Sequence, residues 1–129
     1  MNDHGEEYVK YRIAKAHEAL NDAILLANNS SWNGCMNRLY YSCFYATSAL
    51  LLNHGIDIKT HSGLKAQFNL HFVKTGKIPK ELGQLYSELM NWREKTDYAD
   101  AFDFTKENVE SLLSPVKEFV TMTIGLIKL

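Results

Sequence analysis

Apolar residues recur at helical spacing in two long segments in the first half of the chain. Between residues 6 and 27 they occur in steps of three and four, at Val9, Ile13, Ala16, Leu20, Ala23 and Ala27. This spacing predicts an amphipathic helix, and the turn-forming residues 28–31 predict its end. A second helical pattern covers residues 32–53, and Gly55 follows it where a helix commonly stops.

The second predicted helix is apolar around nearly its whole circumference. Beside a stripe at helical spacing it carries Tyr40, Tyr41, Phe44 and Tyr45, and no charged residue follows Arg38 in it. Such a helix must be covered by other protein surface on nearly every side. Because one short chain can hardly supply that cover alone, we expect part of this helix to form a homodimer interface.

Two shorter helical patterns follow, over residues 61–75 and 79–96. Thr60 or Ser62 is a suitable N-cap for the first of them. Pro79 stands in the first turn of the second, where its missing N–H group is tolerated. Both patterns therefore predict helices with defined starting points.

The last helical pattern begins near Thr105, after an expected loop over residues 97–104, and continues to about residue 127. Pro115 lies inside this pattern. Because proline cannot donate the backbone hydrogen bond of a helix interior, it predicts a kink or a split into two helices near Ser114.

Short links between these elements predict an all-α fold, an antiparallel up-and-down bundle of about five helices. No strand pattern and no internal repeat interrupt it, so residues 1–129 are expected to form a single domain. The hydrophobic share of 46% supplies an ordinary core, and two prolines and seven glycines leave few turning points.

The location of the protein is predicted from its apolar stretches and cysteines. The polar start of the chain does not resemble a signal peptide, and the longest apolar stretch, residues 39–52, is shorter than the roughly 20 residues that cross a bilayer. Cys35 and Cys43 lie too far apart along one helix for a disulfide. We therefore expect a cytoplasmic protein with free thiols and no membrane association.

Several kinds of catalytic site lack their sequence patterns. The chain contains no Glu-x-x-His pair, no histidines spaced i, i+4, no glycine-rich phosphate loop and no Gly-x-Ser-x-Gly turn. We therefore expect no metal and no cofactor. Of the familiar enzyme arrangements, only metal-free acid–base chemistry remains.

The charge is unevenly distributed, although the net charge is only −1. Residues 59–80 contain five lysines and no acidic residue, whereas residues 81–110 contain eight acidic residues and three basic ones. Two solvated faces would account for this pattern. The other interpretation is a basic patch for phosphate and an acidic patch for a basic partner.

Three segments, in this order, carry a resemblance to a known family: Asn37-Arg38-Leu39-Tyr40-Tyr41, Lys59-Thr60-His61-Ser62-Gly63, and Arg93-x-x-x-Asp97-Tyr98. Together with the helical frame from about residue 8 to residue 127, they resemble the HEPN family, specifically its small stand-alone members. The resemblance implies a helical bundle that dimerises and associates with RNA or nucleotides. It also implies a toxin–antitoxin-like partnership with a small nucleotidyltransferase.

Many members of that family are metal-independent endoribonucleases with an Arg, a polar residue and, a few positions later, a His. Here Arg93 matches the Arg, but Glu94 follows it and the expected His positions hold Tyr98, Ala99 and Asp100. A carboxylate is a poor acid at neutral pH and repels phosphate. Because the segment after Arg93 lacks an imidazole, the resemblance favours a non-catalytic HEPN module over an enzyme.

Alternatives remain at this stage. One is a metal-independent endoribonuclease centred on Arg93 with Asp97 or Tyr98 in altered roles, and another is a purely structural interaction protein. The i, i+4 pair of Arg93 and Asp97 is equally consistent with an ordinary ion pair, and His61 with a capping residue. The candidate residues for binding RNA or a nucleotide are Arg93, Lys59, His61, Lys65, Asn37 and Arg38.

Overall fold

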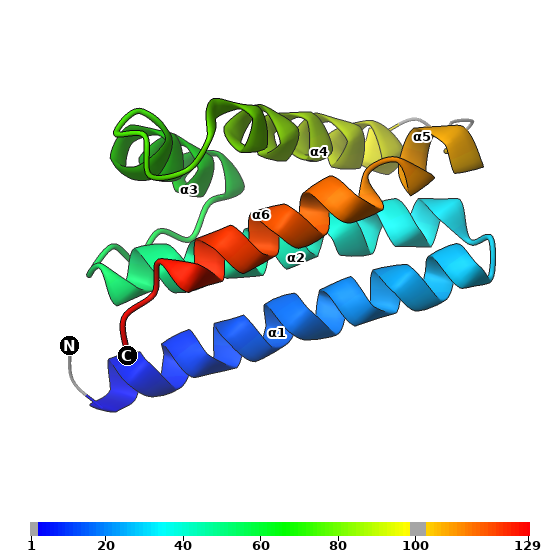
Figure 1. The fold of residues 1–129 in the computed structure, drawn as a ribbon. Helices are drawn as coiled ribbons and strands as arrows, with labels where there is room; N and C mark the ends of the chain where they lie inside the picture. Colours follow the sequence, from blue (N-terminus) through cyan, green and yellow to red (C-terminus); the bar gives the residue numbers. More distant parts are fainter. Residues whose placement is uncertain (1–2, 99–102) are drawn as a thin grey trace.

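The computed structural model describes the backbone of residues 3–98 and 103–129 and the side chains of residues 5–95 and 103–129. The elements along the chain are α1 (Asp3–Asn28), α2 (Trp32–Asn53), α3 (His61–Phe68), the π-helical turn η1 (Asn69–Val73), α4 (Lys80–Tyr98), α5 (Lys106–Glu110) and α6 (Leu113–Gly125). Within the described ranges no strand is present, which confirms the predicted all-α bundle (Figure 1).

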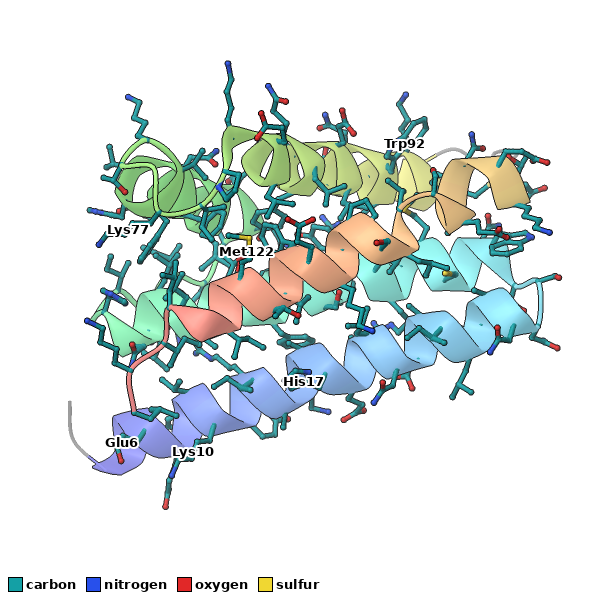
Figure 2. The ribbon with its side chains drawn as sticks, in the orientation of Figure 1. Glu6, Lys10, His17, Lys77, Trp92 and Met122 are labelled. Atoms are coloured by element: carbon teal, nitrogen blue, oxygen red, sulfur yellow. The ribbon has the colours of Figure 1, made fainter. Side chains whose placement is uncertain are left out.

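Successive long helices run in opposite directions. In Figure 1, α1 and α2 form an antiparallel pair, α4 lies on the far side of α2 from α1, and α6 lies across α2. Both chain ends lie at the end of the bundle where α1 begins. Side chains fill the space between α4, α6 and α2, and Met122 of α6 lies there (Figure 2).

The predicted helix ends agree with the local chemistry. Thr60 caps α3, because its side-chain oxygen accepts the Gly63 N–H at 3.1 Å. Gly55 and Gly76 follow α2 and η1 with φ near +80°, a conformation that favours glycine. Within residues 61–75 the structure differs from the predicted continuous α-helix, because the backbone hydrogen bonds change to the π-helical pattern from Asn69.

Pro115 produces the predicted split. The last helical segment divides into α5 and α6, and Pro115 occupies the first turn of α6, where it needs no N–H partner. Thr105 and Asn108 form a reciprocal capping box at the start of α5. Of the expected loop over residues 97–104, residues 99–102 lie outside the described ranges, and α4 extends to Tyr98.

The helix α2 lies at the centre of the bundle and contacts α1, α3, α4, α5 and α6. Its side chains Leu39, Tyr40 and Leu50 are fully buried. The expectation that one copy can hardly cover this helix is therefore wrong for most of its circumference. Apart from residues at its two ends, one stripe of α2 remains half-buried, and it consists of Asn37, Arg38, Tyr41, Phe44, Tyr45 and Leu52.

Both cysteines are buried free thiols, as predicted. Burial raises the pKa of Cys35 to about 11 and also raises the pKa of Cys43. Over the part of the chain that the structure describes, no helix is long and apolar enough to cross a membrane.

The central position of α2 predicts a contrast between two leucines. Leu50→Ala should lower the free energy of unfolding by about 2–5 kcal/mol, because it leaves a cavity in a closed core. Leu25→Ala, on α1, should change it by less than about 0.5 kcal/mol, because that side chain is 66% exposed. Urea denaturation followed by circular dichroism measures both, and equal effects would contradict the central position of α2.

Candidate functional site

Side chains from three helices meet along the half-buried stripe of α2. Tyr41 lies one helical turn after Asn37 and Arg38, so these three residues share one side of the helix. The N-cap Thr60 sets the start of α3, and His61 is its first residue. The group, which we call the Tyr41 cluster, consists of Asn37, Arg38, Tyr40, Tyr41 and Phe44 of α2, His61 of α3 and Arg93 of α4.

The guanidinium group of Arg38 is held in place by its neighbours. Its Nε and Nη2 donate to Asn37 Oδ1 at 3.1 and 3.0 Å, and its Cζ lies 5.1 Å from the centre of the Tyr41 ring. Within residues 5–95 and 103–129, no carboxylate forms an ion pair with Arg38. A half-buried cation without a carboxylate partner is well suited to bind an external anion.

Arg93 also contacts Tyr41. Its Nη1 donates to the Tyr41 hydroxyl at 3.4 Å, a long hydrogen bond, and its Cζ lies 5.1 Å from the centre of the Tyr40 ring. Both arginines are half-buried. The cluster therefore places two guanidinium groups around one tyrosine, among aromatic rings that partly exclude water.

His61 brings an imidazole into the same cluster. Its ring stacks on Phe44 with centroids 4.5 Å apart, and its Nδ1 lies 2.5 Å from the Tyr40 hydroxyl oxygen. Burial, and then the charge of Arg93, lower the pKa of His61 below its ordinary value of 6.5, while Glu94 opposes the shift. Both effects favour the neutral imidazole.

Tyr40 keeps its phenolic proton. Its side chain is completely buried, and this burial raises the pKa of the hydroxyl against the opposing charge of Arg93. The hydroxyl therefore takes part in the cluster as a neutral group that both donates and accepts hydrogen bonds.

Four of the predicted candidates lie together, namely Asn37, Arg38, His61 and Arg93. Lys59 is exposed in the segment before α3, and Lys65 is half-buried one turn after His61. The other two predicted candidates fall where no side chain is described. The backbone of Asp97 and Tyr98 closes α4, but their side chains lie outside the described ranges.

The expectation that the neighbourhood of Arg93 lacks an imidazole is wrong. No histidine follows Arg93 in α4, but His61 reaches the cluster from α3. Sequence reasoning assigned Tyr40, Tyr41 and Phe44 to the core or a dimer interface, which is confirmed for Tyr40 because it is completely buried. Tyr41 and Phe44 are half-buried. The spacing of the Asn-Arg-x-Tyr-Tyr segment was the available signal for Tyr41, because it places that ring one turn from Arg38.

The described residues offer little for metal chemistry. Across residues 5–95 and 103–129, no group of three His, Cys, Asp or Glu side chains is arranged to hold a metal ion. The groups that the Tyr41 cluster does offer are guanidinium groups, which can bind an anion, and imidazole and phenol groups, which can form hydrogen bonds.

Comparison with known proteins adds a family to this geometry. Residues 9–126 match the sequence profile of the HEPN domain. The chain is 41% identical over 115 residues to a UPF0332 protein of Thermotoga maritima, covering 89% of this chain and 87% of that protein.

Two proteins of Methanocaldococcus jannaschii whose names describe them as candidate toxins are also similar. One is 35% identical over 86% of this chain and 76% of its own length. The other is 32% identical over 93% of this chain and 89% of its own length.

Proposed function

The chain belongs to the HEPN family, and on that basis we propose that it is a toxin-like, non-catalytic HEPN protein whose Tyr41 cluster binds RNA through a backbone phosphate. The observation that carries the proposal is the arrangement of Arg38 and Arg93 around Tyr41, with no described carboxylate paired with Arg38. The names of the two archaeal relatives support the toxin-like role.

Phosphate fits this arrangement better than a carboxylate side chain of a protein partner would. A guanidinium group presents its donors in a planar fork, and two such groups can share the oxygens of one phosphate. Asn37 occupies Nε and one proton of Nη2 of Arg38, which leaves the Nη1 side for a ligand. With a net charge of −1, the chain has no general attraction for polyanions, so binding depends on this local site.

The aromatic rings favour single-stranded RNA over a duplex. Tyr41 and Phe44 are only half-buried, Tyr41 contacts both guanidinium groups, and Phe44 packs against Tyr41. Proteins that bind single strands combine cations for the backbone with rings on which unpaired bases stack. A duplex keeps its bases stacked inside and would use only the cations.

Two further partners are proposed. A homodimer through α2 is proposed at the Tyr45 and Leu52 end of the half-buried stripe, next to the Tyr41 cluster and not over it. A nucleotidyltransferase encoded nearby is the proposed protein partner, and its support is the resemblance to small stand-alone HEPN proteins. A cytoplasmic location is also proposed, and the free thiols of Cys35 and Cys43 support it.

An endoribonuclease is the second candidate function, and the observation in its favour is the imidazole of His61 beside Arg93. It would use Arg93 to stabilise the charge on phosphorus and a neighbouring group to move the proton of the 2′-hydroxyl. The proposed roles of Asp97 and Tyr98 in such an enzyme concern side chains outside the described ranges.

Arginine substitutions test RNA binding. Arg38→Ala and Arg93→Ala should each weaken binding of a short single-stranded RNA by about tenfold to a hundredfold, because each removes a charge-assisted hydrogen bond. The slope of log affinity against log salt should fall by about 0.7 for each lost contact. Fluorescence anisotropy at several salt concentrations measures both quantities.

Lys10→Ala is the matched control, because this exposed side chain lies on α1 away from the cluster and carries the same charge. It should leave RNA affinity nearly unchanged. Equal losses in all three variants would show general electrostatic attraction, and unchanged affinity in both arginine variants would contradict the proposal.

The proposed dimer has its own test. Light scattering at micromolar concentration should give twice the 14.8 kDa mass of one chain, and Tyr45→Glu should shift the protein to the monomer. Tyr11→Glu, at an exposed tyrosine of α1, should leave the mass unchanged. A monomer mass for the unmodified protein would rule out the dimer.

Incubation with total RNA in EDTA separates binding from cleavage. The proposal predicts that the purified protein leaves the RNA intact under conditions in which it binds. Cleavage that disappears in Arg93→Ala would establish the second candidate function instead, whereas cleavage that persists in this variant indicates a contaminating nuclease.

A further inference from the structure

We propose that His61 binds a phosphate oxygen as a neutral hydrogen-bond donor through Nε2, because the hydroxyl of Tyr40 occupies its other ring nitrogen. The inference rests on the proposed binding of RNA at the Tyr41 cluster. It adds a third group to the two guanidinium groups and assigns the position of the imidazole proton, which decides whether the site can act as a base.

The first step concerns the proton of the Tyr40 hydroxyl. This side chain is completely buried, and its only hydrogen bond within the described ranges joins its oxygen to His61 Nδ1 at 2.5 Å. A buried hydroxyl that donates to nothing costs free energy, so the phenol proton must point at Nδ1. When Nδ1 accepts, the proton of a neutral imidazole lies on Nε2.

The second step explains why the imidazole stays neutral. A charged ring would carry a proton on Nδ1 as well, and the Tyr40 proton would then need another acceptor, which the described residues do not provide. Arg93 of α4 and the positive end of α3 both disfavour a cation at this position. Glu94 of α4 opposes them but is exposed, and the ring of Tyr41 of α2 forms a T-shaped contact with the imidazole.

The third step concerns Nε2. With Nδ1 occupied by Tyr40, Nε2 is the remaining ring nitrogen for a ligand, and no described side chain forms a hydrogen bond with it. Stacking on Phe44 fixes the plane of the ring. Arg93 lies over the ring of Tyr40, so a phosphate bound by Arg93 is close to the imidazole that Tyr40 holds.

This tautomer has a consequence for chemistry. A general base needs an unprotonated nitrogen facing the 2′-hydroxyl of RNA, whereas Nε2 carries a proton here. The imidazole therefore adds to phosphate binding and does not remove the proton that starts RNA cleavage. The arrangement explains how an imidazole can lie beside Arg93 in a protein that binds RNA without cutting it.

Nitrogen NMR of protein labelled with ¹⁵N-histidine observes the tautomer directly. For His61 we expect Nδ1 unprotonated and Nε2 protonated at pH 7, and addition of a short single-stranded RNA should shift the Nε2 resonance. Tyr40→Phe should remove the donor to Nδ1 and raise the pKa of His61. Tyr86→Phe, which removes the hydroxyl of another completely buried tyrosine, should leave the His61 resonances unchanged.

RNA affinity provides a second readout. His61→Ala should weaken binding about tenfold. In Tyr40→Phe, affinity should rise as pH falls from 7.5 to 5.5 (roughly the range in which a free histidine gains its charge), because His61 can then become a cation. The unmodified protein should show a flatter profile, because the Tyr40 proton on Nδ1 opposes protonation of the ring.

Different failures separate the two proposals. RNA binding that leaves the Nε2 resonance unshifted, or an Nδ1 that proves to be protonated at pH 7, overturns the role of His61 while binding by the arginines stands. Cleavage of RNA in EDTA that His61→Ala abolishes also overturns it. Absence of RNA binding altogether overturns the proposed function and with it the phosphate role of His61.

Discussion

The covering of α2 is the constraint on which the rest of the fold depends. Exposure of an apolar helix surface to water costs free energy, so the other helices must surround α2. α1 runs along one side of α2, and α4 and α6 cover others (Figure 1). One side stays partly open, and the arginine, tyrosine and histidine side chains with binding chemistry gather there.

Aromatic rings pack against both cations of this open side. Arg38 lies over Tyr41 and Arg93 over Tyr40, and such contacts offset part of the cost of removing a guanidinium group from water. A carboxylate partner would have cancelled the charge of Arg38 as well. The two tyrosine hydroxyls fix the cluster further, since Tyr41 accepts from Arg93 and Tyr40 donates to His61. The result is a site with two ordered guanidinium groups, as the proposed binding of an anion requires.

Local sequence patterns predicted the helices well because local spacing determines them. The apolar stripe from Val9 to Ala27 gave α1, Gly55 marked the end of α2, and Pro115 produced the break before α6. The π-helical turn at Asn69 has no such local signal, and the pattern there is compatible with an ordinary helix. The open side of α2 was likewise unpredictable, because it depends on how five other elements pack.

The part of the site that lies on one helix was predictable, because local spacing determines it. Asn37 and Arg38 share a helix, so their relation to Tyr41 follows from helical period. His61 and Arg93 are 32 positions apart on different helices, and only the tertiary fold brings them together. A search for a histidine within a few residues of Arg93 covers only the neighbouring sequence. It cannot find a histidine that another helix brings close to Arg93.

The central claim is that the two arginines around Tyr41 contact RNA phosphate, and the Nε–Hε resonances of the arginines test it most directly. On titration with a short single-stranded RNA, the resonances of Arg38 and Arg93 should shift in a saturable manner. The resonance of Arg12, which bonds Asp57 at 3.4 Å, should not move. Saturable binding that leaves Arg38 and Arg93 unshifted and instead shifts the lysines of residues 59–80 would contradict the account.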